Sequence, residues 1–140
     1  MLRVTADTNI FISSLVFPGG KPFQLLQLAR AGKINLTVSD AILDEIGGVL
    51  ARKFGWQPHD IAEARKWITE IARTATPAVQ LNVIKEDPAD DRILECAVAA
   101  GADYIVSGDN DLLRLGQYDG MPIMNPSDFL TLFQSREQER

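Results

Sequence analysis

Two aspartates stand where the chain could build a reactive site. Asp7 directly follows the strand-like stretch 2–6, and Asp109 follows the apolar stretch 104–106 within three residues. In a parallel α/β sheet, the loops after the C-terminal ends of the strands line the ligand crevice. The sequence therefore predicts that Asp7 and Asp109 share one acidic pocket.

Two further carboxylates, Glu45 and Asp91, lie on predicted helices. Glu45 follows Ile42 by three residues and precedes Val49 by four, so it lies along the edge of an apolar helix stripe and against the protein. Asp91 belongs to the acidic turn 87–91, which opens the helix before Asp109. Each acid on its own could be no more than a helix cap or a turn residue, because aspartate is favoured there.

Several carboxylates in one pocket indicate a divalent cation. Converging negative charges repel one another and raise each other's pKa unless a cation compensates them. Carboxylate oxygens suit Mg²⁺ or Mn²⁺, whereas zinc normally brings histidine or cysteine, and this chain has only His59 and Cys96. Such a site can hold a phosphodiester oxygen and lower the pKa of a bound water. The chemistry it implies is metal-assisted phosphodiester hydrolysis.

The elements that would position these acids alternate between strands and helices. Strands are predicted at 2–6, 34–38, 79–83, 104–106 and 121–124, and helices at 10–17, 22–31, 40–50, 61–74, 88–100 and 129–133. This order predicts an α/β fold, a three-layer α/β/α sandwich with a mostly parallel central sheet of about five short strands. We expect one domain over residues 1–134 and a frayed charged tail over 135–140.

Length and charge narrow the class of protein further. A chain of 140 residues, 46% of them hydrophobic, suits one compact domain. The net charge of −5 argues against a broad basic surface for nucleic acid, but not against an enzyme that meets nucleic acid at a metal-filled acidic site. No apolar run approaches the ~20 residues of a membrane span, and Met1 leads directly into a strand. We therefore expect a cytoplasmic protein without a membrane partner.

Four motifs, in order along nearly the whole chain, resemble those of the PIN domain family. They most resemble the branch described as toxin components of prokaryotic toxin–antitoxin systems, the VapC-like ribonucleases. The motifs are Asp7-Thr8-Asn9 after the first strand, residues 39–45 with Leu50, Asp87-Pro88-Ala89-Asp90-Asp91 with Glu95-Cys96-Ala97, and Ser107-Gly108-Asp109-Asn110-Asp111-Leu112.

The resemblance implies a Mg²⁺- or Mn²⁺-dependent endoribonuclease that cuts RNA to leave a 5′-phosphate and a 3′-hydroxyl. It also implies a homodimer inhibited by a small antitoxin protein. The resemblance implies an acidic quartet that binds metal and carries catalysis, namely Asp7, Glu45, Asp91 and Asp109. It also implies two supporting polar residues, Asn9 and Ser107.

Two assignments leave alternatives open. Asp90 and Asp91 are adjacent, and helical periodicity puts Asp90 nearer the apolar stripe. Asp91 is chosen because 18 residues separate it from Asp109, as between the third and fourth acids of the family. Asp111 is either an additional metal ligand or a turn residue.

Rival functions make different demands on the chain. A phosphatase that forms an aspartyl-phosphate needs a second aspartate two residues after the first, where this chain has Asn9. A receiver domain needs a lysine near the last strand, and residues 121–126 contain none. The remaining alternative is a non-catalytic PIN-like module that binds RNA or protein. Retention of all four acids argues against it, since a site without metal would gain from losing like charges.

Overall fold

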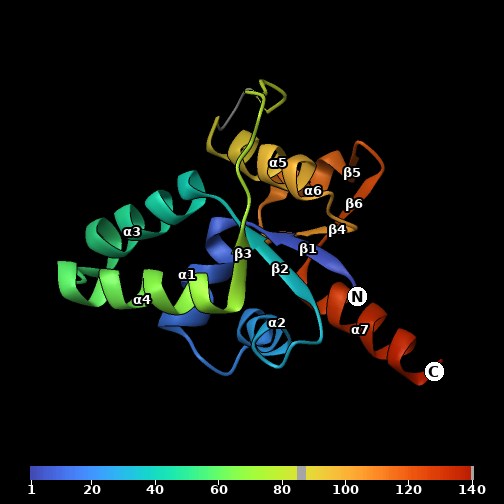
Figure 1. Ribbon diagram of the computed structural model, residues 1–140, viewed down its shortest axis with the longest axis horizontal. Helices are drawn as coiled ribbons and strands as arrows, with labels where there is room; N and C mark the ends of the chain where they lie inside the picture. Colours follow the sequence, from blue (N-terminus) through green and yellow to red (C-terminus); the bar gives the residue numbers. More distant parts are fainter. Residues whose placement is uncertain (85–87, 140) are drawn as a thin grey trace.

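A mixed β-sheet forms the centre of the protein (Figure 1). The computed structural model describes residues 1–84 and 88–139, and within them the sheet has six strands in the order β3-β2-β1-β4-β6-β5. The strands are β1 (Arg3–Ala6), β2 (Asn35–Val38), β3 (Ala72–Thr74), β4 (Tyr104–Val106), β5 (Gln117–Tyr118) and β6 (Met121–Met124). Neighbouring strands pair in parallel, except that β5 is antiparallel to β6. The predicted mostly parallel sheet is confirmed.

Helices cover both faces of this sheet. They are α1 (Thr8–Val16), α2 (Lys21–Arg30), α3 (Asp40–Phe54), α4 (Pro58–Ile71), α5 (Pro88–Ala100), α6 (Asn110–Leu115) and α7 (Pro126–Gln138). Helix α5 packs on β1 and β2 from one side, while α2 packs on β2 from the other and contacts α1, α4 and α7 (Figure 1). The predicted α/β/α layering is therefore confirmed. None of the described helices is long and apolar enough to cross a membrane.

Short side chains fix where the helices near the site begin. Asp7, Ser39 and Asp109 are the N-caps of α1, α3 and α6, and each accepts a hydrogen bond from the backbone amide three residues later. Such caps satisfy amides that have no partner within the helix. Helix α3 ends at Gly55, whose φ of 67° is a left-handed conformation that glycine adopts without strain. Two of the predicted site residues, Asp7 and Asp109, thus also shape the backbone.

The third strand is not where the alternating pattern placed it. Residues 79–83 were predicted as a strand, but they form no regular secondary structure, and Val79 and Val83 are exposed. The strand beside β2 is β3, with Ala72 opposite Leu36, at residues that were predicted to end the preceding helix. In the part of the chain that the structure describes, no strand pairs with residues 79–83.

Three smaller differences concern the ends of elements. The short antiparallel strand β5 was not predicted. The last helix, predicted at 129–133, spans Pro126–Gln138, so most of the segment expected to be a frayed tail is helical. Asp87, predicted to open the acidic turn, lies outside the described residues.

Candidate active site

The parallel strands β1 and β4 bring the first and last motifs together. Ala6 is paired with Val106, and the Asp7 amide donates to the Val106 carbonyl at 3.0 Å. Asp7 and Ser107 are therefore neighbours at the C-terminal edge of the sheet. The Ser107 hydroxyl donates to Asp7 Oδ2 and accepts from the amide of Asp109 at 2.9 Å. Ser107, predicted as polar support, links the two acids.

Asp7 is a buried carboxylate at this edge. Its side chain is 3% exposed, and its Oδ1 accepts from the Ile10 amide at 3.1 Å. Burial raises the pKa of Asp7 to about 6; the hydrogen bonds from Ser107 and Ile10 oppose this rise, and the charge of Asp109 adds to it. Burial makes the charged form of Asp7 less favourable than it is in water, so a cation placed beside it would relieve an electrostatic cost.

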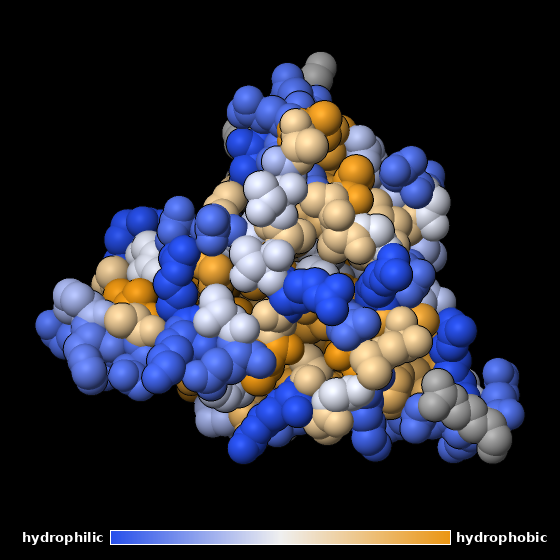
Figure 2. Space-filling view, in the orientation of Figure 1, coloured by the Kyte–Doolittle hydropathy of each residue, from blue (hydrophilic) through white to orange (hydrophobic). Residues whose placement is uncertain are grey.

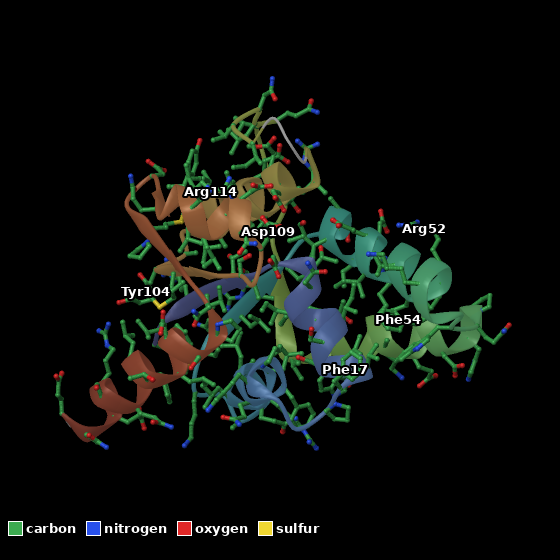
Figure 3. All side chains as sticks on the ribbon, turned by 180° about the vertical axis from the view of Figure 1, so that it is seen from behind. Phe17, Arg52, Phe54, Tyr104, Asp109 and Arg114 are labelled. Atoms are coloured by element: carbon green, nitrogen blue, oxygen red, sulfur yellow. The ribbon has the colours of Figure 1, made fainter. Side chains whose placement is uncertain are left out.

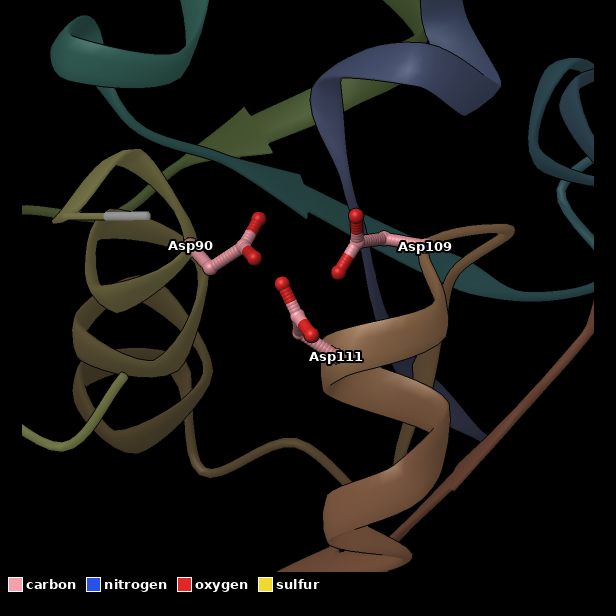
Figure 4. Close-up of side chains that lie close together, drawn as sticks. All are labelled: Asp90, Asp109 and Asp111. Atoms are coloured by element: carbon pink, nitrogen blue, oxygen red, sulfur yellow. The ribbon is translucent and has the colours of Figure 1, made fainter. Parts of the chain in front are cut away.

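Three more aspartates face one another across the pocket mouth. Asp90 comes from α5, Asp109 from the end of β4 and Asp111 from the first turn of α6, and their carboxylates point toward a common space (Figure 4). One oxygen of each lies within 4.8 Å of the other two. Two oxygens bound to the same Mg²⁺ are at most about 4.2 Å apart, since each metal–oxygen distance is about 2.1 Å. Side-chain shifts of less than about 1 Å would therefore let these carboxylates share an ion.

The structure corrects the choice between the adjacent acids of α5. Asp91, predicted to be in the pocket, is 1% exposed and turns away from it; its Oδ1 accepts from the amides of Val83 and Ile84 at 2.8 and 2.9 Å. Asp90 lines the pocket instead. Neighbouring residues on a helix project about 100° apart, so only one of the two can face the site.

The pocket itself is small and polar. Its volume is about 40 Å³, and its lining consists of Asp7, Thr8, Asn9, Glu45, Ala89, Asp90, Ile93 and Asp109. Glu45 and Asn9, both predicted as site residues, thus lie in it together with Asp7 and Asp109. A water molecule needs roughly 10–15 Å³ of such space, so the pocket has room for an ion with a few waters and not for a nucleotide.

Thr8 is a site residue that the sequence-based predictions missed. It is 5% exposed and lines the pocket, and its hydroxyl has no hydrogen-bond partner among the described residues. Buried hydroxyls are nearly always hydrogen-bonded, so the Thr8 hydroxyl is available to donate to a water or ligand bound in the pocket. The position of Thr8 directly after Asp7 was the one indication in the sequence that it belongs to the site. A threonine at the first position of a helix is also common without any such role.

We expect replacement of Thr8 by valine to affect binding more than folding. Valine keeps the shape, and no protein partner is left unpaired, so the free energy of unfolding should change by less than about 1 kcal/mol. Loss of one hydrogen bond to a bound ligand should weaken affinity by up to about tenfold. Denaturant unfolding and Mn²⁺ titration of Thr8→Val measure the two effects. Thr131→Val is the control, because the Thr131 hydroxyl donates to the Ser127 carbonyl on α7. A destabilisation above about 2 kcal/mol would contradict the assignment.

The chemistry of the donors fits a hard cation and not a soft one. The charged side chains that line the pocket are all carboxylates. Cys96 is fully buried in the core, and burial raises the pKa of its thiol to about 11, so it offers no thiolate. The carboxylate-lined pocket at the C-terminal edge of the parallel sheet puts the protein in the class of α/β proteins with an acidic site suited to a divalent metal ion.

Comparison with known proteins places the chain in a family within that class. The PIN domain profile matches residues 3–111, so the chain belongs to the PIN domain family. It is 30% identical over 118 residues to the uncharacterized protein MJ1680 of Methanocaldococcus jannaschii. The aligned stretch covers 81% of this chain and 75% of that protein. The predicted family is thereby confirmed.

Two solved structures share the fold. One is VapBC2 from Rickettsia felis, in a crystal structure bound to a DNA fragment from its promoter; the TM-score is 0.64 at 15% identity, covering 89% of this chain and 98% of that one. The other is PAE2754 from Pyrobaculum aerophilum, with a TM-score of 0.58 at 12% identity and coverage of 96% and 98%. At these identities the likeness concerns the fold.

Proposed function

We propose that the protein is a metal-dependent endoribonuclease that hydrolyses RNA phosphodiester bonds. The observation that carries the proposal is the convergence of Asp90, Asp109 and Asp111 beside the buried Asp7, at the edge of the sheet where parallel α/β proteins bind ligands. Membership of the PIN domain family supports it. The cofactor is Mg²⁺ or Mn²⁺, which suits a set of oxygen donors.

The residues of the pocket divide the work. Asp90 and Asp109, with Asp111 at the rim, would hold the cation, and Asp7 would contribute its negative charge from below. A bound divalent cation supplies Lewis acidity to the scissile phosphate and stabilises the leaving oxygen. Glu45, which also lines the pocket, would orient the attacking water and accept its proton, and the Thr8 hydroxyl would donate to a bound oxygen.

Ser107 and Asn9 support this arrangement in different ways. Ser107 joins Asp7 to the backbone of Asp109 and so keeps both acids in register. Asn9 is exposed at the rim, where its amide could meet the ribose or phosphate of the RNA. Because the pocket does not admit a nucleotide, RNA would pass across the rim and insert only a phosphate. Arg114 on α6 is exposed, forms an ion pair with Asp111 at 3.0 Å and would meet a neighbouring phosphate (Figure 3).

The biological role we propose is that of a toxin in a prokaryotic toxin–antitoxin system. The motifs resemble that branch of the family, and the fold is shared with VapBC2 of Rickettsia felis. We expect a small antitoxin protein as partner, a homodimer and a cytoplasmic location. Hydrophilic side chains cover most of α3 and α4 on the face seen in Figure 2. Size-exclusion chromatography with light scattering tests the dimer.

Metal removal is the direct test of the activity. Purified full chain should cut a 5′-labelled single-stranded RNA in millimolar Mn²⁺ or Mg²⁺, stop in excess EDTA, and resume when Mn²⁺ is restored. Mass spectrometry of the products should find a 5′-phosphate and a 3′-hydroxyl. Asp109→Asn should reduce cleavage by roughly 100-fold or more. Asp44→Asn is the matched control, because Asp44 is an exposed acid of α3 that pairs with Arg65.

The outcomes separate the two candidate functions. Cleavage that persists in EDTA would contradict a metal-dependent mechanism. RNA binding without cleavage, together with no rise in melting temperature at millimolar Mn²⁺, would favour a non-catalytic PIN-like module, because a ligand that binds only the folded state must stabilise it.

A further inference from the structure

Helix α5 holds an irregular segment of chain with its own side chains. Besides the two amides bound by Asp91, the Leu81 amide donates to Glu95 Oε2 at 2.7 Å. Arg92 donates to the Leu81 carbonyl at 3.2 Å and forms an ion pair with Glu95 at 2.9 Å. Side chains on one face of α5 thus bind the amides of Leu81, Val83 and Ile84 and the carbonyl of Leu81.

The two carboxylates involved are almost completely inaccessible to solvent. Asp91 is 1% exposed and Glu95 is 6% exposed. They are four residues apart, so they lie on the same face of α5, one turn above the other. Burying two carboxylates is unfavourable unless they are well hydrogen-bonded, and the amides of Leu81, Val83 and Ile84 provide those bonds. Nothing in the proposed chemistry uses either group.

We propose that Asp91 and Glu95 are positioning residues, which clamp residues 81–84 to α5 and so hold Asp90 in the acidic pocket. The inference rests on the proposed function, in which Asp90 is a metal ligand. Ile84 precedes α5 by only four positions, and Asp91 belongs to the first turn of that helix. Anchoring the Val83 and Ile84 amides to Asp91 therefore fixes the rotation of the first turn of α5. Because Asp90 is the adjacent residue, that rotation decides whether its carboxylate faces Asp109.

A positioning role and a metal-ligand role for Asp91 predict different effects of substitution by asparagine and by alanine. A metal ligand at position 91 must carry charge, so asparagine and alanine should both abolish binding. An anchor at position 91 needs only an acceptor oxygen for two amides, which asparagine retains and alanine lacks. The pair Asp91→Asn and Asp91→Ala therefore tests the assignment, with Asp90→Asn as the ligand variant and Asp44→Ala as the exposed-acid control.

The experiment combines Mn²⁺ titration calorimetry with amide hydrogen exchange on the full chain. Asp91→Asn should bind Mn²⁺ within about threefold of wild type, and Asp91→Ala about 10- to 100-fold more weakly, the usual effect of losing a group that orients a ligand. The Val83 and Ile84 amides should exchange faster in Asp91→Ala alone. Asp90→Asn should lose Mn²⁺ binding and keep both amides protected. Should Asp91→Ala fail to fold, Glu95→Gln and Glu95→Ala provide the same comparison at the Leu81 amide.

Two results would overturn the inference. If Asp91→Asn loses Mn²⁺ binding as completely as Asp90→Asn while Val83 and Ile84 stay protected, Asp91 is itself a ligand. If Asp91→Ala binds Mn²⁺ like wild type, the clamp does not position the site. Failure of the proposed function gives a different pattern: wild type itself binds no Mn²⁺, and the clamp then has no metal site to position, although exchange at Val83 and Ile84 still shows whether it exists.

Discussion

Replacement of Asp7 by asparagine is expected to make the metal-free protein more stable and at the same time to abolish cleavage. The pKa of Asp7 is raised from 3.8 to about 6, so keeping it charged at pH 7 costs about 3 kcal/mol, at about 1.4 kcal/mol per pKa unit. Asparagine removes the charge and can still accept the hydrogen bond from the Ile10 amide that caps α1, while its NH2 group replaces Oδ2 and would donate to Ser107 Oγ. The free energy of unfolding without metal should therefore rise by about 2–3 kcal/mol at pH 7.

The same substitution should remove the function because a neutral amide is a poor partner for a divalent cation. RNA cleavage should fall by roughly 100-fold or more, and the Mn²⁺-dependent rise in melting temperature should largely disappear. Urea unfolding in EDTA, thermal unfolding with Mn²⁺ and RNA cleavage measure the three effects. Asp44→Asn should change stability by less than about 1 kcal/mol and leave cleavage intact, because Asp44 forms only an exposed ion pair. An Asp7→Asn variant that cleaves at the wild-type rate would rule out Asp7 as a functional residue.

Most of the fold was predictable because the local signals agree with the buried environment of each element. Strand β6 has the predicted bounds, and β2 and α5 differ from them by at most one residue. The signal failed for residues 79–83, which alternate like a strand although side chains of α5 bind the Leu81 and Val83 amides. Conversely, β3 has just three residues, of which only Ala72 is buried, so its sequence is too short to show the alternation that predicts a strand.

The candidate site was predictable as an edge of the sheet but not in every side chain. The positions of Asp7 and Asp109 follow from strand order, since both come after the ends of adjacent parallel strands. Helical periodicity put Asp90 nearer the apolar stripe, and the choice of Asp91 came instead from its spacing to Asp109; burial does not separate the two, since both residues are less than a tenth exposed. Which one faces the pocket depends on the contact of Asp91 with residues 83 and 84, and no local rule predicts a helix that binds an irregular segment.

Titration of Asp7 predicts opposite pH dependences for stability and for metal binding. Between pH 3.8 and about 6 the folded protein holds a proton on Asp7 that the unfolded chain has released. The folded state binds more protons over this range, so the contribution of Asp7 to stability is greatest below pH 3.8 and is lost as the pH rises through 6. The difference in unfolding free energy between Asp7→Asn and wild type in EDTA should therefore be small at pH 4 and should grow to about 2–3 kcal/mol at pH 7.

Metal binding follows the opposite direction, because the cation competes with the proton on Asp7. Below pH 6, Mn²⁺ should displace one proton from Asp7 as it binds, and its apparent affinity should fall by up to about tenfold for each unit of pH. Calorimetric titrations at pH 5 and 7, in buffers of different ionisation enthalpy, measure both the affinity and the proton released. Thr8→Val, which leaves Asp7 intact, should keep the same proton release at a weaker overall affinity. Affinity that stays constant from pH 5 to 7 would show that the Asp7 carboxylate is not coupled to the metal. Asp7, whose buried charge lowers the stability of the metal-free protein, would then act only as the N-cap of α1.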